Sequence, residues 1–146
     1  MIDRVHALTA RYRRSGILLD TNLLILLLVG TFDPQRISTF KRTRLYTADD
    51  FELLVLLLEP FDIVLTTPNV LTEVSNLSGN LGGHFDAGYF TALIKRVRGL
   101  QEIYTRSIDS MEKPEFLRLG LTDVGLIDSA VGRYLLLTND LDLYAW

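Results

Sequence analysis

The stretch that decides the fold is residues 16–29, with the sequence GILLDTNLLILLLV. Its first part, residues 16–19, is a short apolar run that ends at Asp20, which is typical of a buried strand. The second part, residues 22–29, is apolar nearly all round, so its periodicity fits either a buried helix or part of a longer strand. In both cases the stretch belongs to the buried interior.

On the C-terminal side of this stretch, strand patterns alternate with helix patterns. We predict further strands at residues 63–66, 102–107 and 133–138. We predict helices at residues 48–59 after an N-cap at Thr47, from Pro68 after an N-cap at Thr67, at 85–99, at 113–119, and at 123–132 after an N-cap at Thr122. The segments 30–44 and 76–83 are predicted as loops. This alternation predicts an α/β fold with a parallel sheet that is covered on both faces.

Length and composition restrict the function. The 146 residues make one domain, and the longest apolar run, residues 23–29, is far shorter than a membrane span of about 20 residues. Residues 1–14 contain no continuous apolar segment of the kind found in secretory signals, so we expect a cytoplasmic protein. Because the chain has no Cys and two His, any metal ion must be bound mainly by oxygen atoms.

The charges are distributed unevenly along the chain. The net charge is −3, but residues 1–50 contain eight Lys and Arg against five Asp and Glu, whereas the remainder is acidic. The basic part includes residues 1–15, which we predict to form an N-terminal helix that carries Arg11, Arg13 and Arg14 to the functional site or to a subunit contact. An acidic protein with a basic part remains compatible with a nucleic-acid partner.

Carboxylates follow two of the predicted strands. Asp20 is followed by Thr21 and Asn22, and Asp140 is preceded by Thr138 and Asn139. Ligand sites in open parallel sheets lie beyond the carboxyl ends of the strands, so we expect both carboxylates in one crevice if the strands are neighbours. Taken singly, each Asp also fits a turn or a helix cap.

Further acidic residues stand near the starts of predicted helices. Glu73 lies in the helix after Pro68, Asp123 lies in the first turn of its helix, and Asp142 follows Asp140 by two residues. Bare carboxylates that share one edge of a sheet repel each other, and a hard cation such as Mg²⁺ or Mn²⁺ relieves that repulsion. Such a cation polarises phosphoryl oxygens and activates water. We expect Thr21, Asn22, Thr138 and Asn139 to orient the carboxylates.

These motifs together resemble the PIN-domain nucleases. The resemblance covers residues 16–142 and rests on Asp20-Thr21-Asn22, Glu73, Leu121-Thr122-Asp123 and Leu137-Thr138-Asn139-Asp140. It implies a Rossmann-like α/β/α sandwich and Mg²⁺- or Mn²⁺-dependent hydrolysis of RNA. The acidic quartet would be Asp20, Glu73, Asp123 and Asp140, with Asp142 as an accessory acid. Many bacterial members are toxins of toxin–antitoxin pairs and form homodimers, so the resemblance also implies an antitoxin partner and a dimer.

The chain departs from the family pattern at both ends. In the family a last helix and an edge strand follow the TND motif, whereas this chain stops at Trp146, so the last edge strand is expected to be missing or cut off. The segment of residues 1–15 before the first strand is longer than in compact toxins of the family.

Two basic clusters are candidates for holding RNA phosphates. They comprise Arg11, Arg13 and Arg14, and Lys41, Arg42 and Arg44, with residues 95–98 as a third candidate. A solvated surface without a partner explains each cluster equally well.

Other classes of enzyme fit the sequence less well. A haloacid dehalogenase-type phosphatase needs an Asp where Asn22 stands, and a response-regulator receiver needs a Lys at a strand end. The glycines at 79, 82 and 83 follow a helix and not a strand, which excludes a dinucleotide or Walker site. The remaining alternative is a catalytically inactive PIN fold that binds RNA or protein.

Overall fold

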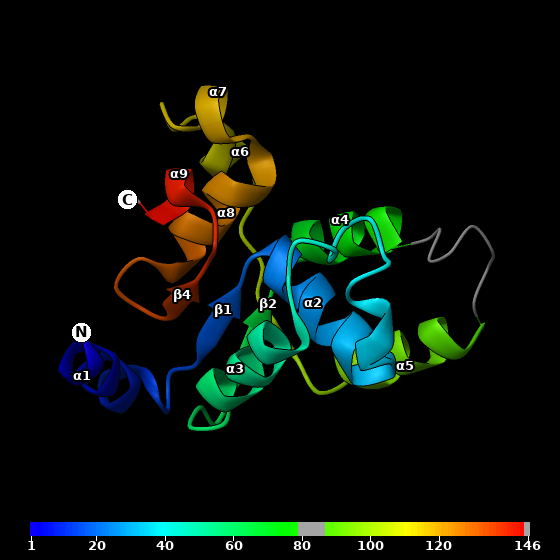
Figure 1. Ribbon diagram of the computed structural model, residues 1–146. Coiled ribbons are helices and arrows are strands. Elements are labelled where there is room, and N and C mark those ends of the chain that lie inside the picture. Colours follow the sequence, from blue (N-terminus) through cyan, green and yellow to red (C-terminus); the bar gives the residue numbers. More distant parts are fainter. Residues whose placement is uncertain (79–86, 145–146) are drawn as a thin grey trace.

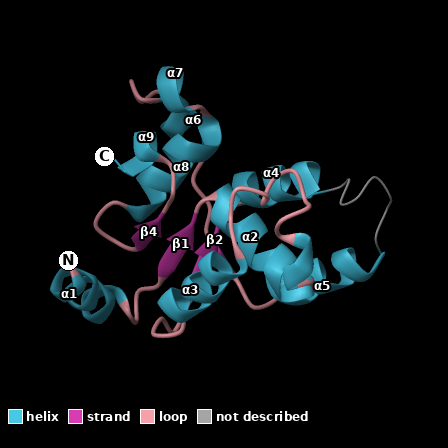
Figure 2. Cartoon of the chain, viewed as in Figure 1, coloured by secondary structure: helices cyan, strands magenta, loops and turns pink. Residues whose placement is uncertain are grey.

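The structure is a computed structural model that describes residues 1–78 and 87–144. In this part of the chain short parallel strands form a central sheet with helices around it (Figures 1 and 2). The elements are α1 (Ile2–Tyr12), β1 (Ile17–Leu19), α2 (Thr21–Phe32), the 3₁₀ helix η1 (Pro34–Arg36), α3 (Ala48–Leu58), β2 (Val64–Thr66), α4 (Pro68–Ser78), α5 (Ala87–Val97), β3 (Gln101–Glu102), α6 (Ser107–Met111), α7 (Phe116–Leu119), α8 (Leu121–Ala130), β4 (Leu135–Leu137) and α9 (Leu141–Tyr144).

The predicted α/β class is confirmed. The four strands run parallel in the order β3-β2-β1-β4, as expected for a Rossmann-like sandwich. Figure 1 shows α8 with α6, α7 and α9 on one side of the strands, and α2, α3 and α5 on the other. No helix within the described residues is long and apolar enough to cross a membrane.

The apolar segment that the sequence left open is the central helix α2. Residues 23–30 are all buried, because α2 packs against α3, α4 and α5 as well as the sheet. The close approach to α3 depends on Gly30, since a Cβ atom at this position would lie 2.3 Å from the ring of Phe51. The helix extends to Phe32, beyond residue 29, because nothing in 30–32 breaks it before Asp33 caps η1.

The sheet register determines where the site forms. Strand β1 pairs with β4 through Leu19 and Leu137, so the residues that follow both strands emerge side by side at the carboxyl edge. Strand β2 pairs with the other side of β1 and leads into α4 at the same edge. The condition that β1 and β4 be neighbours is therefore fulfilled.

Several predicted boundaries are confirmed and others are wrong. Helix α3 begins with a capping box in which Thr47 and Asp50 bond each other's backbone N–H groups, and Thr67 accepts a hydrogen bond from the N–H of Val70 at the start of α4. Helix α4 continues to Ser78, so residues 76–78 of the predicted loop are helical, and residues 79–83 lie outside the described part. Helix α5 is described from Ala87, so residues 85 and 86 of its prediction also lie outside.

The region between β3 and α8 differs most from expectation. The predicted strand 102–107 is a two-residue strand followed by α6, and the predicted helix 113–119 is shortened to α7. Helix α8 begins one residue before Thr122, with Gly120 at its N-cap, so Thr122 does not cap it. The backbone of Gly120 has φ of +81°, a conformation that favours glycine and places the N-cap there.

Candidate functional site

A polar pocket of about 140 Å³ lies at the carboxyl edge of the sheet. Its walls come from the start of α2, the middle of α4, the first turn of α8 and the segment after β4. The structure brings together all four acids of the predicted quartet here, along with two expected neighbours of the acids and two leucines. The lining residues are Asp20, Thr21, Asn22, Glu73, Leu77, Asp123, Asp140 and Leu143.

Asp20 is the most buried of these acids, with 3% of its surface exposed. One carboxylate oxygen accepts the backbone N–H of Leu23 at 2.8 Å and so caps α2. The other oxygen accepts the hydroxyl of Thr138 at 2.6 Å and the backbone N–H of Asn139 at 3.1 Å. Desolvation raises the pKa of Asp20, the charge of Asp140 adds to this, and the three hydrogen bonds oppose it.

Glu73 is held by two threonine hydroxyls from different helices. Thr21 donates to one of its carboxylate oxygens at 2.9 Å, and Thr122 donates to the other at 2.6 Å. Glu73 thereby connects α4 to the first turns of α2 and α8. The orienting role expected of Thr21 is directed at Glu73, and Thr122 has the same role although its sequence position suggested a helix cap.

Asp123 differs from Asp20 and Glu73 in having no hydrogen-bond or ion-pair partner among the described residues. It is partly buried, and its pKa is raised to about 6, first by desolvation and then by the charges of Asp140, Glu73 and Asp20. Asp140 accepts the backbone N–H of Asp142 at 2.8 Å. No Lys, Arg or His lines the pocket in the described part of the chain, so the negative charge gathered here has no cationic side chain beside it.

The pocket therefore has donors that suit a hard cation, although they do not form a complete ligand set as they stand. Within residues 1–78 and 87–144, no three acidic or histidine side chains lie close enough together to hold one metal ion. The donor atoms are nevertheless all oxygen, and Asp123 is free of hydrogen bonds that would hold it in place. Both features fit Mg²⁺ or Mn²⁺, which prefer oxygen ligands and keep several waters.

Other expected residues have different positions. Asp142 lies in the first turn of α9, outside the pocket lining, where its side chain is 73% exposed and 3.9 Å from Arg118. The structure does not bring this predicted accessory acid to the quartet, because α9 turns it outward. Asn22 lines the pocket as expected, whereas the side chain of Asn139 donates to the hydroxyl of Tyr46.

The N-terminal basic cluster lies away from the acidic pocket. Helix α1 is present as predicted, but it leads into the amino end of β1, and Arg13 pairs with Asp62, which precedes β2. Arg11, Arg13 and Arg14 are exposed at that opposite edge of the sheet, so they do not flank the acidic pocket, and the alternative of a subunit contact stays a prediction. Lys95 and Arg96 line a separate pocket with Thr31 and Phe32, at the far end of α2.

The second basic cluster lies on the segment that leads toward the site. Lys41, Arg42 and Arg44 are exposed between η1 and α3, and Tyr46 at the end of this segment contacts Asn139 beside the pocket. Burial, followed by the charges of Asp20 and Asp50, raises the pKa of Tyr46 to about 12. The role of Tyr46 was not evident from sequence, because no motif connects it to Asn139, 93 residues away.

Comparisons with known proteins add no relative. The chain matches no protein-family model, no curated protein and no solved structure. The functional argument therefore rests on the residues and the geometry of the site.

Proposed function

We propose that this chain is a metal-dependent endoribonuclease of the PIN type. The observation that carries the proposal is Asp123, a partly buried carboxylate without a partner in a pocket that it shares with three other acids. Burial of unpaired negative charge is costly, and natural proteins keep it mainly where a cation or a reaction uses it. The order of the motifs around these acids supports the choice of the PIN type.

Asp20, Glu73, Asp123 and Asp140 would hold the cation, which when bound supplies polarisation of a phosphate and activation of water. Asp20 is oriented by Thr138 and the backbone of Asn139, and Glu73 is oriented by Thr21 and Thr122. These hydrogen bonds keep Asp20 and Glu73 in fixed positions, and Asp140 is held by the backbone N–H of Asp142, whereas Asp123 has no such contact among the described residues. The chain thus provides three oriented carboxylates and one that can adjust to a cation.

The exposed Lys41, Arg42 and Arg44 would bind RNA phosphates beside the acidic pocket. Contacts of this kind give affinity with little choice of sequence and strong dependence on salt. By the resemblance, hydrolysis would leave 5′-phosphate and 3′-hydroxyl ends.

Metal binding is tested by thermal unfolding with and without Mn²⁺. A ligand that binds only the folded protein raises stability by RT ln(1 + [L]/Kd), so we expect a higher melting temperature at millimolar Mn²⁺. Asp123→Asn should remove most of this increase, whereas Asp128→Asn, on the same helix but ion-paired with Lys113, should retain it. An unchanged melting temperature of the wild-type protein in Mn²⁺ would contradict the proposed metal site.

Catalysis is tested with a labelled single-stranded RNA in Mn²⁺, with EDTA and Asp20→Asn as controls. We expect cleavage only by the wild-type protein with metal. RNA binding without cleavage would favour the alternative of an inactive RNA-binding module, and cleavage that persists in Asp20→Asn would indicate a contaminant.

A cytoplasmic location, a homodimer and an antitoxin protein are further parts of the proposal that follow from the resemblance. Sedimentation of the purified protein tests the homodimer. Co-purification with the product of a neighbouring reading frame, together with relief of RNA cleavage by that product, tests the antitoxin.

A further inference from the structure

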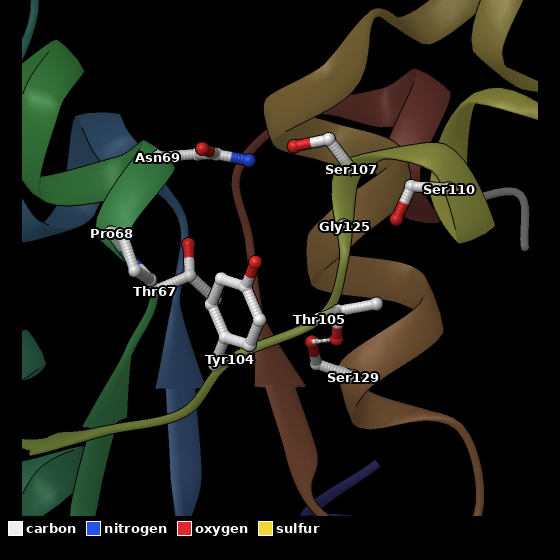
Figure 3. A pocket seen from close by; sticks show the side chains of 9 residues that line it. All are labelled: Thr67, Pro68, Asn69, Tyr104, Thr105, Ser107, Ser110, Gly125 and Ser129. Atoms are coloured by element: carbon white, nitrogen blue, oxygen red, sulfur yellow. Dashed lines mark hydrogen bonds between the residues drawn. The ribbon is translucent and has the colours of Figure 1, made fainter.

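A leucine-lined groove of about 190 Å³ lies beside the acidic pocket. Six leucines from α2, α3 and β4 form most of its lining, and Tyr46, Asp50, Thr138 and Asn139 complete it. The pocket drawn in Figure 3, between the start of α4 and α8, is much smaller, since its 30 Å³ hold about two water molecules. The leucine groove is therefore large enough for part of an organic ligand, whereas the smaller pocket is not.

Two residues of the leucine groove also hold the carboxylate of Asp20. The backbone N–H of Leu23 donates to one of its oxygens at 2.8 Å, and the hydroxyl of Thr138 donates to the other at 2.6 Å. Leu23 and Thr138 line the groove, whereas Asp20 lines the acidic pocket. The groove and the acidic pocket are therefore direct neighbours, separated by the contacts of one side chain.

Tyr46 and Asn139 give the leucine groove an aromatic ring and a polar end. Tyr46 is partly buried and packs against the core, and its hydroxyl accepts a hydrogen bond from the side chain of Asn139. The side-chain amide of Asn139 makes no other hydrogen bond within residues 1–78 and 87–144, so a second N–H and the carbonyl oxygen remain for a ligand. An aromatic ring beside an amide that both donates and accepts suits the face and the edge of a nucleobase.

The size of the groove and the charges near it fit one nucleotide of an RNA strand. An apolar cavity of about 150 Å³ is enough to hold benzene, so the volume of the leucine groove accommodates a six-membered base ring. The exposed Lys41, Arg42 and Arg44 lie on the segment directly before Tyr46. Cations for the phosphates, a groove for a base and the acidic pocket thus follow one another along one path.

We propose that the leucine groove binds an unpaired nucleobase next to the phosphate at the acidic pocket, with Tyr46 as its stacking surface. This proposal rests on the proposed nuclease function and deepens it by naming the class of substrate. Bases within a duplex are stacked and paired, so a base must leave the helix before it can enter such a groove. The groove therefore selects single-stranded RNA over duplex RNA.

The test compares a short single-stranded RNA with an abasic oligomer of the same length and charge, both in EDTA so that no metal-dependent cleavage occurs. Amide chemical shifts of the full chain are followed in each titration at low salt. We expect saturable shifts at residues 46–57 and 137–139 with the RNA, and about tenfold weaker binding of the abasic oligomer. Equal affinity for the two oligomers would overturn the inference, and absence of binding to both would contradict the proposed RNA substrate as well.

Two substitutions on α3 test whether the leucine groove causes the preference for bases. Leu53→Asp places a carboxylate in the groove, whereas Leu56→Asp adds the same charge on the same helix outside the groove lining. Both leucines are exposed, by 55% and 62%, so we expect both variants to melt near the temperature of the wild type. Leu53→Asp should bind the RNA and the abasic oligomer equally, whereas Leu56→Asp should keep the preference for RNA. Loss of the preference in both variants, or in neither, would overturn the inference.

The cleavage assay in Mn²⁺ separates the two proposals. Preferential binding of RNA over the abasic oligomer by a protein that never cleaves RNA would support the leucine groove and contradict the nuclease alone. Metal-dependent cleavage by a protein that binds both oligomers equally would contradict the groove alone.

Discussion

At the scale of single residues, the four acids of the pocket have distinct environments. Asp20 and Glu73 have both carboxylate oxygens engaged, whereas Asp123 depends on solvent or a cation. The sequence predicted all four acids of the pocket and the threonines after the strands. Three of these acids stand in short local motifs, whereas Glu73 stands alone in its helix. The sequence could not predict that Thr122 donates a hydrogen bond to Glu73 or that Tyr46 contacts Asn139, since each contact joins segments that only the folded chain brings together.

The raised pKa of Asp123 predicts a dependence of stability on pH. Its pKa is about 6 in the folded protein against an ordinary value of 3.8 for an aspartate, so the folded state binds the proton more tightly. The free energy of unfolding without metal should therefore decrease as the pH rises from about 4 to 6, and remain low above this range. Asp20, whose pKa is also raised, contributes in the same direction.

Asp123→Asn should remove the part of this loss of stability at higher pH that comes from Asp123. We expect urea unfolding in EDTA at pH 7.5 to show a stabilisation of about 1 kcal/mol, smaller than the full shift implies because the side chain is partly solvated. The difference from the wild type should disappear near pH 4. A variant less stable than the wild type at pH 7.5 would contradict the assigned cause of the pKa shift.

The hydrogen bonds to Glu73 should be energetically coupled. Thr21→Val and Thr122→Val each remove one donor to the same carboxylate, and each should cost about 1 kcal/mol in urea unfolding. The double variant should deviate from the sum of the single effects, because both threonines share one partner. Strict additivity would indicate that Glu73 makes these contacts only weakly.

At the scale of elements, the helix α2 organises both the core and the site. Its residues 23–30 fill the space between the sheet and three helices, and its N-cap is Asp20 itself. Helix starts were predicted well where a cap precedes an apolar run, as at Thr47 and Thr67. The region from 101 to 120 was predicted poorly, because its short helices carry no long apolar period and depend on packing against α8.

The contact between α2 and α3 predicts a strong effect at Gly30. In Gly30→Ala the added methyl group would lie 2.3–2.6 Å from three ring atoms of Phe51, so the helices must separate or the ring must move. We expect a loss of about 1–3 kcal/mol in urea unfolding. Gly125→Ala in α8 is the matched control, since its nearest neighbour is 3.8 Å away and helix propensity favours Ala.

At the scale of the whole molecule, the two basic clusters lie at different edges of the sheet. Residues 41–44 lead to Tyr46 and the acidic pocket, while Arg13 pairs with Asp62 at the opposite edge. The sequence by itself did not distinguish the two clusters, because each contains three basic residues close together. Their separation became visible only from the strand directions.

This arrangement predicts different effects of neutralising each cluster. The triple substitution of Lys41, Arg42 and Arg44 to Ala should weaken binding of single-stranded RNA and reduce its salt dependence, by up to about 0.7 in log–log slope for each lost contact. The same substitution at Arg11, Arg13 and Arg14 should leave both nearly unchanged. Fluorescence anisotropy in EDTA at several salt concentrations measures both quantities, and equal losses would contradict the assignment.

The bond between Thr138 and Asp20 spans 118 residues of sequence. During synthesis, the first strand and its carboxylate leave the ribosome long before the segment that completes their surroundings. A nascent chain therefore carries no assembled acidic quartet until residue 140 has emerged and β4 has paired with β1, and such long-range pairing is slow to form. If the pocket cleaves RNA, the growing chain is harmless to its own messenger throughout most of translation.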